Sequence, residues 1–453
     1  MMSERNDLSR VGSLVSKWEQ VTQAEGDDSA NCWSGVRYNA NNGWYVNATN
    51  GIVNNNNSIN RYRVVPCRSV ELLYHKILDA EADCYRNKHH SMEAAKVHYH
   101  LASLYSLAEE LESKTYKPQP SRCFVVDYPV PREIFCAVYR DRVVHHYFTP
   151  SLIELSEQRH TANGNVSHGN RKGCSAYTAA CMAQKLMRSR SENWTRECWV
   201  ATVDFKGYFM SLPKDKVAES VFSLDGDKRE LVLDYLKQDV TKDCERRSPI
   251  SAWGKVGKGK SLFTAKDGCG LPIGNYPSQI LANLYRAKID EAITRESGVG
   301  YVAFVDDLLL CGNLEQVQKG IEIAERVSRE MGLTLHPRKR YIQRVDHGVR
   351  FCGYVIKCDR IYIGNRVVRA CEYVAATETD ESALCRRLNS YFGLMAHCRS
   401  WNIQKRIAKL VLNRCSGLYF QKRGSQLVCR MKNHKNKYNY ETWKNGWQRH
   451  AAG

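Results

Sequence analysis

Residues 301–311, YVAFVDDLLLC, are the most informative stretch of this sequence. They predict two apolar strands joined at Asp306 and Asp307, where adjacent buried carboxylates need a cation because like charges repel at contact. A hairpin turn that exposes both side chains to water is the structural alternative. The case for a cation strengthens with Asp204, a third carboxylate at the end of the apolar strand CWVATVD, residues 198–204. Three carboxylates on neighbouring strand ends predict a site for two divalent ions about 4 Å apart.

The length and the cysteine pattern favour a large protein of a reducing compartment. At roughly 150 residues per domain, 453 residues predict about three structural units. The 18 cysteines form no CxxC pair and no Cys/His quartet at ligand spacing, so we expect reduced thiols in the cytoplasm, without zinc or disulfides. No apolar run approaches the roughly 20 residues of a spanning helix, and MMSERNDLSR is no signal region, so we expect no membrane partner.

The charge balance favours an anionic partner. Lys and Arg number 67 against 48 Asp and Glu, and we expect this excess of 19 to recur along the chain. Such a field attracts a polyanion, and binding to nucleic acid would weaken steeply with salt because each neutralised phosphate releases counterions. A solubilising surface without any partner is the alternative explanation.

The patterning divides the chain into an unusual start, a mixed middle and a helical end. Residues 31–68 are rich in Asn, which predicts a loop-rich segment, a few short strands or disorder. Residues 124–356 alternate β-rich runs with helices, a pattern of class α/β (α+β). One helix begins at Pro277 and Ser278. Its expected apolar stripe comprises Leu281, Leu284, Tyr285, Lys288 and Ala292.

Five segments stand in the order of the palm motifs A to E of reverse transcriptases, which the sequence therefore resembles: VATVDFKGYF, GLPIGNYPSQILANLY, YVAFVDDLLL, GLTLHPRKRYIQ and VRFCGYVI. Upstream, VPREIFCAVYRDRVVHHYF and GNRKGCSAYTA are similar to the fingers motifs. The resemblance implies a right-hand polymerase whose palm is an antiparallel sheet carrying the catalytic Asp residues. The expected parts are an N-terminal extension (1–68), fingers with N-terminal helices (69–195), palm (196–356, with an insertion near 225–268), helical thumb (357–423) and basic tail (424–453).

The resemblance also implies roles for individual residues. Asp204 and Asp306 would hold two Mg²⁺ ions, or Mn²⁺, with Asp307 beside them and the Phe205 carbonyl assisting. Lys339 would protonate the pyrophosphate as a general acid, although a solvated lysine is the alternative. Other nucleotide contacts would come from Phe209 (a steric gate, or otherwise a core aromatic), Ile273, Gly274, Gln279, Arg132 and Arg140. Nucleic-acid contacts would come from Arg142, Lys172, Gly353, Tyr354, Tyr391 and His397.

Within the reverse transcriptases, LPIGN followed by SQ in motif B is similar to the enzymes of bacterial and phage diversity-generating retroelements. The segment RRLNSYFGLMAHCRSWNIQKR resembles their thumb, with an ordinary amphipathic helix as the alternative. Ile273 stands where accurate enzymes have glutamine, and because Ile cannot hydrogen-bond, the resemblance implies error-prone copying at template adenines.

Several further expectations follow from this resemblance. The Asn-rich stretch looks like the variable end of a diversified target protein, so the gene's 5′ part is hypothesised to overlap the template repeat; an ordinary polar extension is the alternative. The implied partners are template RNA, the cDNA/RNA duplex, dNTPs and a small basic accessory variability protein oligomer, in the cytoplasm of a bacterial host. A retron, group II intron or defence-type enzyme, or a catalytically silent nucleic-acid-binding relative, remains open.

Overall fold

The computed structural model describes the chain as two compact units, Met1–Lys117 and Pro118–Gly453. It describes residues 69–432 apart from 87, 89, 90, 128, 129 and 243, together with the backbone of strands 31–37, 42–47 and 53–57. The first unit includes helices after residue 68, which are expected from the sequence to belong to the fingers. The expected tail from residue 433 onward lies outside the described residues.

The described residues of the first unit form a small antiparallel sheet and three helices. The strands are β1 (Asn31–Arg37), β2 (Asn42–Asn47) and β3 (Val53–Asn57), in the order β1-β2-β3. Of the alternatives for the Asn-rich stretch, the backbone therefore adopts short strands. The helices are α3 (Ser69–Tyr85), α4 (Met92–His98) and α5 (Leu101–Glu112). Tyr74, Ile77, Leu104 and Leu107 are buried on the facing sides of α3 and α5.

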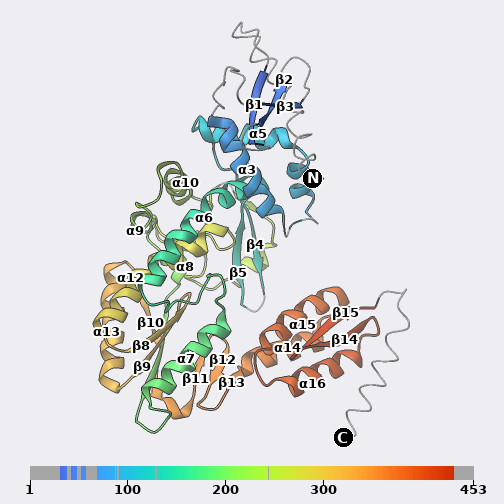
Figure 1. Cartoon of the computed structure of the whole chain (residues 1–453). Helices are drawn as coiled ribbons and strands as arrows, with labels where there is room; N and C mark the ends of the chain where they lie inside the picture. Colours follow the sequence, from blue (N-terminus) through green and yellow to red (C-terminus); the bar gives the residue numbers. More distant parts are fainter. Residues whose placement is uncertain are drawn as a thin grey trace. The chain divides into compact units, whose positions relative to one another are not determined.

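The second unit is built around a four-stranded sheet, here called the palm sheet, with the strand order β10-β6-β9-β8 (Figure 1). All its neighbouring strands are antiparallel. The apolar runs around the three carboxylates form its centre, as the sequence predicts. Its strands are β6 (Trp199–Phe205), β8 (Gly300–Phe304), β9 (Asp307–Gly312) and β10 (Leu335–Arg344).

Helices cover both faces of the palm sheet. Side chains along a strand alternate between the two faces, so the apolar strands place apolar side chains on both faces. On one face Val200 and Leu309 join the core that includes Met187 of α7 (Ala176–Arg190). On the other face Leu310 lies against Gly320 of α13 (Leu314–Glu330), and α12 (Tyr276–Glu296) packs between α13 and α6 (Tyr139–Ala162). Helix α12 is buried on nearly all sides, so the expected single stripe is wrong; Lys288, one of its members, is exposed.

A second sheet and several short helices form the part expected to be the fingers. Its strand order is β5-β4-β7, with β4 and β7 parallel, so the insertion after motif A returns to the sheet made by residues before it. The strands are β4 (Arg122–Val126), β5 (Arg132–Cys136) and β7 (Glu245–Arg246). The helices between β6 and α12 are α8 (Tyr208–Ser211), α9 (Lys214–Glu219), α10 (Gly226–Lys237), α11 (Ile250–Trp253) and η1 (Leu262–Thr264).

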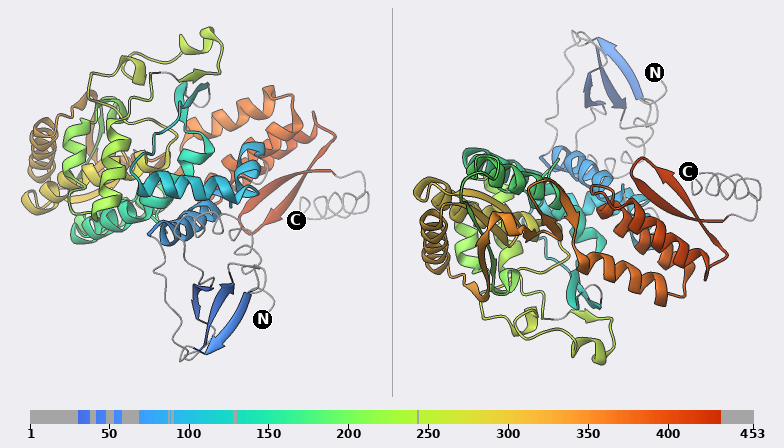
Figure 2. Two further views of the ribbon diagram at one scale, coloured as in Figure 1. Left: turned by 90° about the horizontal axis from the view of Figure 1, so that it is seen from above. Right: turned by 90° about the horizontal axis from the view of Figure 1, so that it is seen from below.

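Up to residue 432, the described C-terminal part contains a small sheet, three α-helices and a hairpin (Figures 1 and 2). The sheet β11-β12-β13 extends past the expected palm boundary at 356, because β13 pairs with β12. The hairpin crosses the expected thumb boundary at 423. The elements are η2 (Val345–His347), β11 (Val349–Phe351), β12 (Tyr354–Ile356), β13 (Ile361–Ile363), α14 (Asn365–Thr377), α15 (Glu381–Met395), α16 (Trp401–Leu412), β14 (Leu418–Arg423) and β15 (Gln426–Met431).

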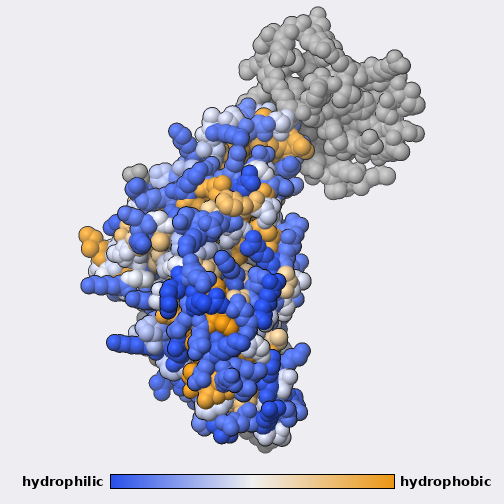
Figure 3. Space-filling view, turned by 90° about the vertical axis from the view of Figure 1, so that its left-hand side faces the viewer, coloured by the Kyte–Doolittle hydropathy of each residue, from blue (hydrophilic) through white to orange (hydrophobic). Residues whose placement is uncertain are grey.

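Every cysteine whose side chain the structure describes is a free thiol. No described helix combines the length and apolar character needed to cross a bilayer. The face shown in Figure 3 is largely hydrophilic, with apolar residues in small scattered patches, an ordinary feature of protein surfaces.

Candidate active site

The strand pairing brings the three carboxylates together. Asp204, near the end of β6, is the direct cross-strand partner of Asp307, the first residue of β9. Such partners have Cβ atoms about 4.5–5.5 Å apart. Asp306 precedes Asp307 in the turn that joins β8 to β9. Two separate segments of sequence therefore converge at one sheet end, which is the arrangement that the sequence predicts.

The turn that carries Asp306 has a strained backbone. Val305 has φ 54°, a conformation that β-branched residues rarely adopt. Neighbouring backbone holds it: Ser167 bridges to Ala303, and the His168 amide donates to the Ala303 carbonyl at 2.9 Å. A Cβ on Gly169 would lie 2.6 Å from the Val305 amide nitrogen, so the loop at 169 packs directly against the turn. Strain held by surrounding structure is common where side chains must be aimed.

The carboxylates are electrostatically coupled. Burial, together with the charges of Asp306 and Asp204, raises the pKa of Asp307 to about 7. Burial and then Asp204 also raise the pKa of Asp306. Because these carboxylates repel one another when ionised, a cation placed among them would be stabilised.

In this structure the cation is the Lys339 ammonium group, which donates a hydrogen bond to Oδ2 of Asp204. The bond raises the pKa of Lys339, and all three carboxylates add to the effect. Lys339 arrives there because the pairing of β10 with β6 jumps from Leu335–Phe205 to Arg340–Val203, so the intervening residues leave the regular ladder. The sequence prediction that Lys339 lies at the site agrees with this position.

The residues fit a divalent ion chemically. Oδ1 of Asp204 is buried and accepts no hydrogen bond from the described residues, and carboxylate oxygens are the ligands that Mg²⁺ prefers. Within the described residues, no three His, Cys, Asp or Glu side chains are preassembled as a metal cluster. Oδ2 of Asp204 accepts the hydrogen bond from Lys339 instead.

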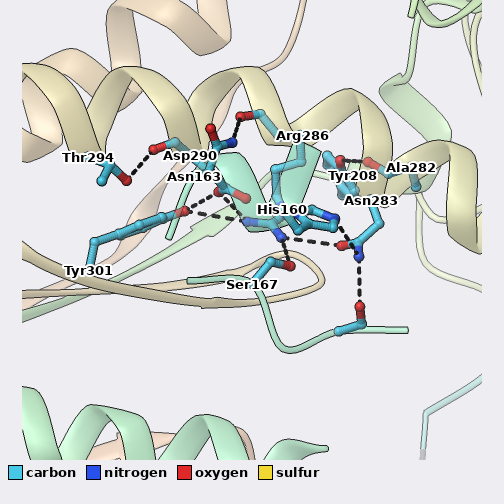
Figure 4. Close-up of polar contacts among 12 residues, drawn as sticks. His160, Asn163, Ser167, Tyr208, Ala282, Asn283, Arg286, Asp290, Thr294 and Tyr301 are labelled. Carbon is cyan, nitrogen blue, oxygen red and sulfur yellow. Dashed lines mark hydrogen bonds and ion pairs between the residues drawn. The ribbon is translucent and has the colours of Figure 1, made fainter. Parts of the chain in front are cut away.

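A fully buried polar network lies beneath the strained turn (Figure 4). Arg286 of α12 donates to Oδ1 of Asp290 at 2.5 Å and to the Ser167 hydroxyl at 2.6 Å, and Tyr301 of β8 donates to the same Asp290 oxygen at 2.6 Å. Asn283 donates to the Gly169 carbonyl at 2.7 Å. The network thus ties α12 to β8 and to the loop that supports Val305.

Sequence reasoning missed this network. The available signal was the spacing of Arg286 and Asp290, an oppositely charged pair four residues apart in the helix. That spacing alone does not distinguish a buried pair from an exposed surface pair. Only the packing of β8 and residue 167 over this side of α12 decides it.

The expected nucleotide contacts gather between motif A and the fingers sheet. Phe209 and Ile273 pack on the same small core, which includes Phe135 of β5. The Phe135 amide donates to the Ile273 carbonyl at 2.8 Å. Gly274 has φ 118°, and a Cβ there would lie 2.5 Å from the Phe135 carbonyl oxygen, so only glycine permits this approach. Phe209 is half-buried, which leaves both the gate and the core role open.

The three candidate arginines have different surroundings. Arg132 is exposed at the start of β5, and its charge lowers the pKa of Asp306, so it faces the carboxylates. Arg142 donates to the Ala137 carbonyl at 2.8 Å and to the Cys136 sulfur, so its side chain stabilises the neighbouring end of β5. Arg140 lies 3.5 Å from Asp141. Arg132 is therefore the best placed of the three for a triphosphate.

The remaining expected contacts form a second group. Tyr354 is buried and lies edge-on to Tyr177 of α7, and His397 stacks on Tyr177 with centroids 4.7 Å apart. Gly353, with φ 83°, precedes Tyr354, and Tyr391 packs partly buried on the same core. The structure therefore joins motif E to the thumb through α7. Lys172 and Gln279 are exposed, and the Gln279 carbonyl accepts a hydrogen bond from Asn170.

Comparisons with known proteins find one family model and several solved structures. Residues 133–356 match the family model described as "Reverse transcriptase (RNA-dependent DNA polymerase)". Similar solved structures are Candida albicans telomerase with a fragment of telomeric RNA (10% identity, TM-score 0.40) and apo telomerase from Candida tropicalis (9% identity, TM-score 0.40). Each alignment covers 69% of this chain and 60% of the other, so this chain spans about three fifths of those telomerases. No curated protein matches the sequence.

Proposed function

We propose that this chain, whose residues 133–356 form a reverse transcriptase domain in a right-hand polymerase fold, is an RNA-directed DNA polymerase. The observation that carries the proposal is the pairing of Asp204 with Asp307 across β6 and β9, next to Asp306. Polymerisation needs negative groups that hold metal between a primer 3′-hydroxyl and a triphosphate. The coupled pKa values of Asp306 and Asp307 are those of groups poised for a cation.

Mg²⁺ bound by Asp204, Asp306 and Asp307, with the Phe205 carbonyl beside them, supplies Lewis-acid activation and charge stabilisation for nucleotidyl transfer. The chain's own groups position the reactants and move the proton. Arg132 pairs with the triphosphate, because a guanidinium binds two oxygens at once. Lys339, whose ammonium group lies at Asp204, would donate its proton to the departing pyrophosphate.

The test is primer extension on an RNA template with Mg²⁺ and dNTPs, comparing wild type with Asp306→Asn. Loss of one carboxylate should lower the rate at least about 1000-fold, since metal-assisted charge stabilisation supplies several kcal/mol. Asp227→Asn is the matched control, because Asp227 is an exposed carboxylate on α10. Equal extension by Asp306→Asn and wild type contradicts the metal assignment. An inactive wild type with intact RNA binding favours a catalytically silent relative.

The finer proposal is an error-prone enzyme of a bacterial or phage diversity-generating retroelement, which makes cDNA for mutagenic retrohoming. Its support is the motif B sequence LPIGN followed by SQ, the thumb residues Tyr391 and His397, and Ile273 in place of a hydrogen-bonding side chain. Template RNA, the cDNA/RNA duplex and an accessory variability protein are then the partners, in the cytoplasm of a bacterial host.

Flanking DNA tests this assignment. A near-copy of a neighbouring gene segment that differs at adenines supports it, and an overlap of that copy with codons 31–68 supports the template-repeat hypothesis for the Asn-rich stretch. A retron RNA gene, an intron or a defence locus beside the gene instead points to those classes of reverse transcriptase.

A further inference from the structure

The positive charge of the chain is concentrated near its C-terminus. Between Glu381 and Glu441 lie 13 of the 67 Lys and Arg residues and none of the 48 Asp and Glu residues, so this stretch carries 13 of the 19 excess positive charges. The expectation that the excess recurs along the chain is therefore wrong. A concentrated field of one sign marks a surface for an oppositely charged partner.

The described part of this stretch is folded, and three of its cations, Lys422, Arg423 and Arg430, lie on a two-stranded ribbon. Leu418, Phe420, Leu427 and Cys429 bury one face of the β14–β15 hairpin against α15 and α16. Because side chains alternate along a strand, the opposite face points outward. That outward face carries Tyr419, Gln421, Arg423, Gln426, Val428 and Arg430.

The basic groups of the ribbon are not neutralised by acids. Arg387 pairs with Glu378, and Arg406 pairs with Glu372. Both glutamates precede the acid-free stretch. Within the described residues, Lys422, Arg423 and Arg430 make no salt bridge. Lys422 instead lies over the ring of Trp401, 5.1 Å from its centroid. We call Lys422, Arg423 and Arg430 the hairpin cations. Arg423 and Arg430 lie on the outward face, whereas Lys422 belongs to the face of Leu418 and Phe420 and is exposed at the end of β14.

We propose that the hairpin cations bind the backbone of folded RNA at a site separate from Asp204, Asp306 and Asp307. A six-residue ribbon extends roughly 20 Å, long enough to follow several phosphates of a duplex. The outward face carries Arg423 and Arg430 beside the polar Gln421 and Gln426, and Lys422 is exposed at the end of the same strand, unlike the apolar core of a protein interface. A basic accessory protein would meet like charge here. The assignment of RNA, among polyanions, rests on the proposed function.

The test is a fluorescence-anisotropy titration of a labelled RNA stem-loop of about 20 base pairs, without dNTPs, over a range of salt concentrations. The variant is Lys422→Gln/Arg423→Gln/Arg430→Gln. Its affinity at about 0.1 M salt should fall at least tenfold, and the slope of log K against log salt should become shallower by about two to three. The matched control is Lys288→Gln/Lys319→Gln/Arg329→Gln, three exposed cations of α12 and α13.

An unchanged salt slope in the hairpin variant, or an equal loss in the control, overturns the proposal. Tight binding of polyglutamate in competition with the stem-loop also overturns the assignment to RNA. An unfolding midpoint equal to that of wild type shows that the triple variant is folded. If the triple variant does not fold, the single variant Arg430→Gln replaces it in the titration, and its salt slope should be shallower by about one. The assay needs no catalysis, so a chain that binds RNA here but extends no primer contradicts only the proposed function.

Discussion

Replacing Asp290 with Asn should strongly destabilise the second unit. Arg286 and Asp290 are both 0% exposed and 2.5 Å apart, and Tyr301 donates to the same carboxylate. Asn keeps the shape but removes the negative charge, so the Arg286 cation remains buried without its counterion. Breaking a buried ion pair in this way costs about 3–5 kcal/mol, a large part of the roughly 5–15 kcal/mol that stabilises a domain.

The neighbouring residue provides the control. Glu291 pairs with Arg295 at 2.5 Å on the same helix, but the Glu291 side chain is 42% exposed. Exposed pairs contribute about 0–1 kcal/mol, because water and salt screen them. The free energy of unfolding is measured by urea titration of wild type, Asp290→Asn and Glu291→Gln. A double variant, Arg286→Met with Asp290→Leu, should recover part of the loss, since it leaves no unpaired buried charge.

Equal losses in Asp290→Asn and Glu291→Gln would refute the reasoning, since burial would then not set the strength of the pair. A double variant less stable than Asp290→Asn alone would show that the bonds from Arg286 to Ser167 and Asn283 matter more than the charge.

Three further outcomes are expected. Lys339→Met should lower kcat about 100-fold in single-turnover primer extension, as loss of a general acid does; a solvated surface lysine would leave kcat unchanged. Ile273→Gln should lower the error rate opposite template adenines on a defined RNA template, because an amide can hydrogen-bond where Ile cannot, and an unchanged rate contradicts the role of Ile273. Burial, reinforced by His146 and Arg142, lowers the pKa of His145 to about 3, below its unfolded value of 6.5. His145 therefore stabilises the fold above pH 6.5, and this contribution falls by about 1.4 kcal/mol per pH unit on acidification below that; urea titrations at pH 7.5 and 5.5 should show a smaller acid loss in His145→Gln.

The active-site strands could be predicted from sequence because their signal is local. Apolar runs before Asp204 and around Asp306 and Asp307 are too short and too uninterrupted to be ordinary surface segments. Carboxylates at their ends have few explanations other than a cation site. The predicted strands β6, β8 and β9 agree with the structure.

The boundaries between parts were harder to predict, because they depend on pairing between distant segments. Strand β13 belongs with β12, and β7 returns to β4 across more than a hundred residues of chain. Neither pairing leaves a local pattern, since any short apolar strand can join a sheet whose edge it reaches.

The sequence by itself determined the chemistry of this protein: three carboxylates at strand ends, an aliphatic residue at 273 and an acid-free basic C-terminal stretch. The tertiary structure alone decided that Arg286 is buried and bonded to the loop beside the turn of Val305, and that Lys339 donates a hydrogen bond to Asp204. The physical reason is that residue type sets what a side chain can do. Burial and partners, which depend on contacts between distant segments, set which of those possibilities it adopts.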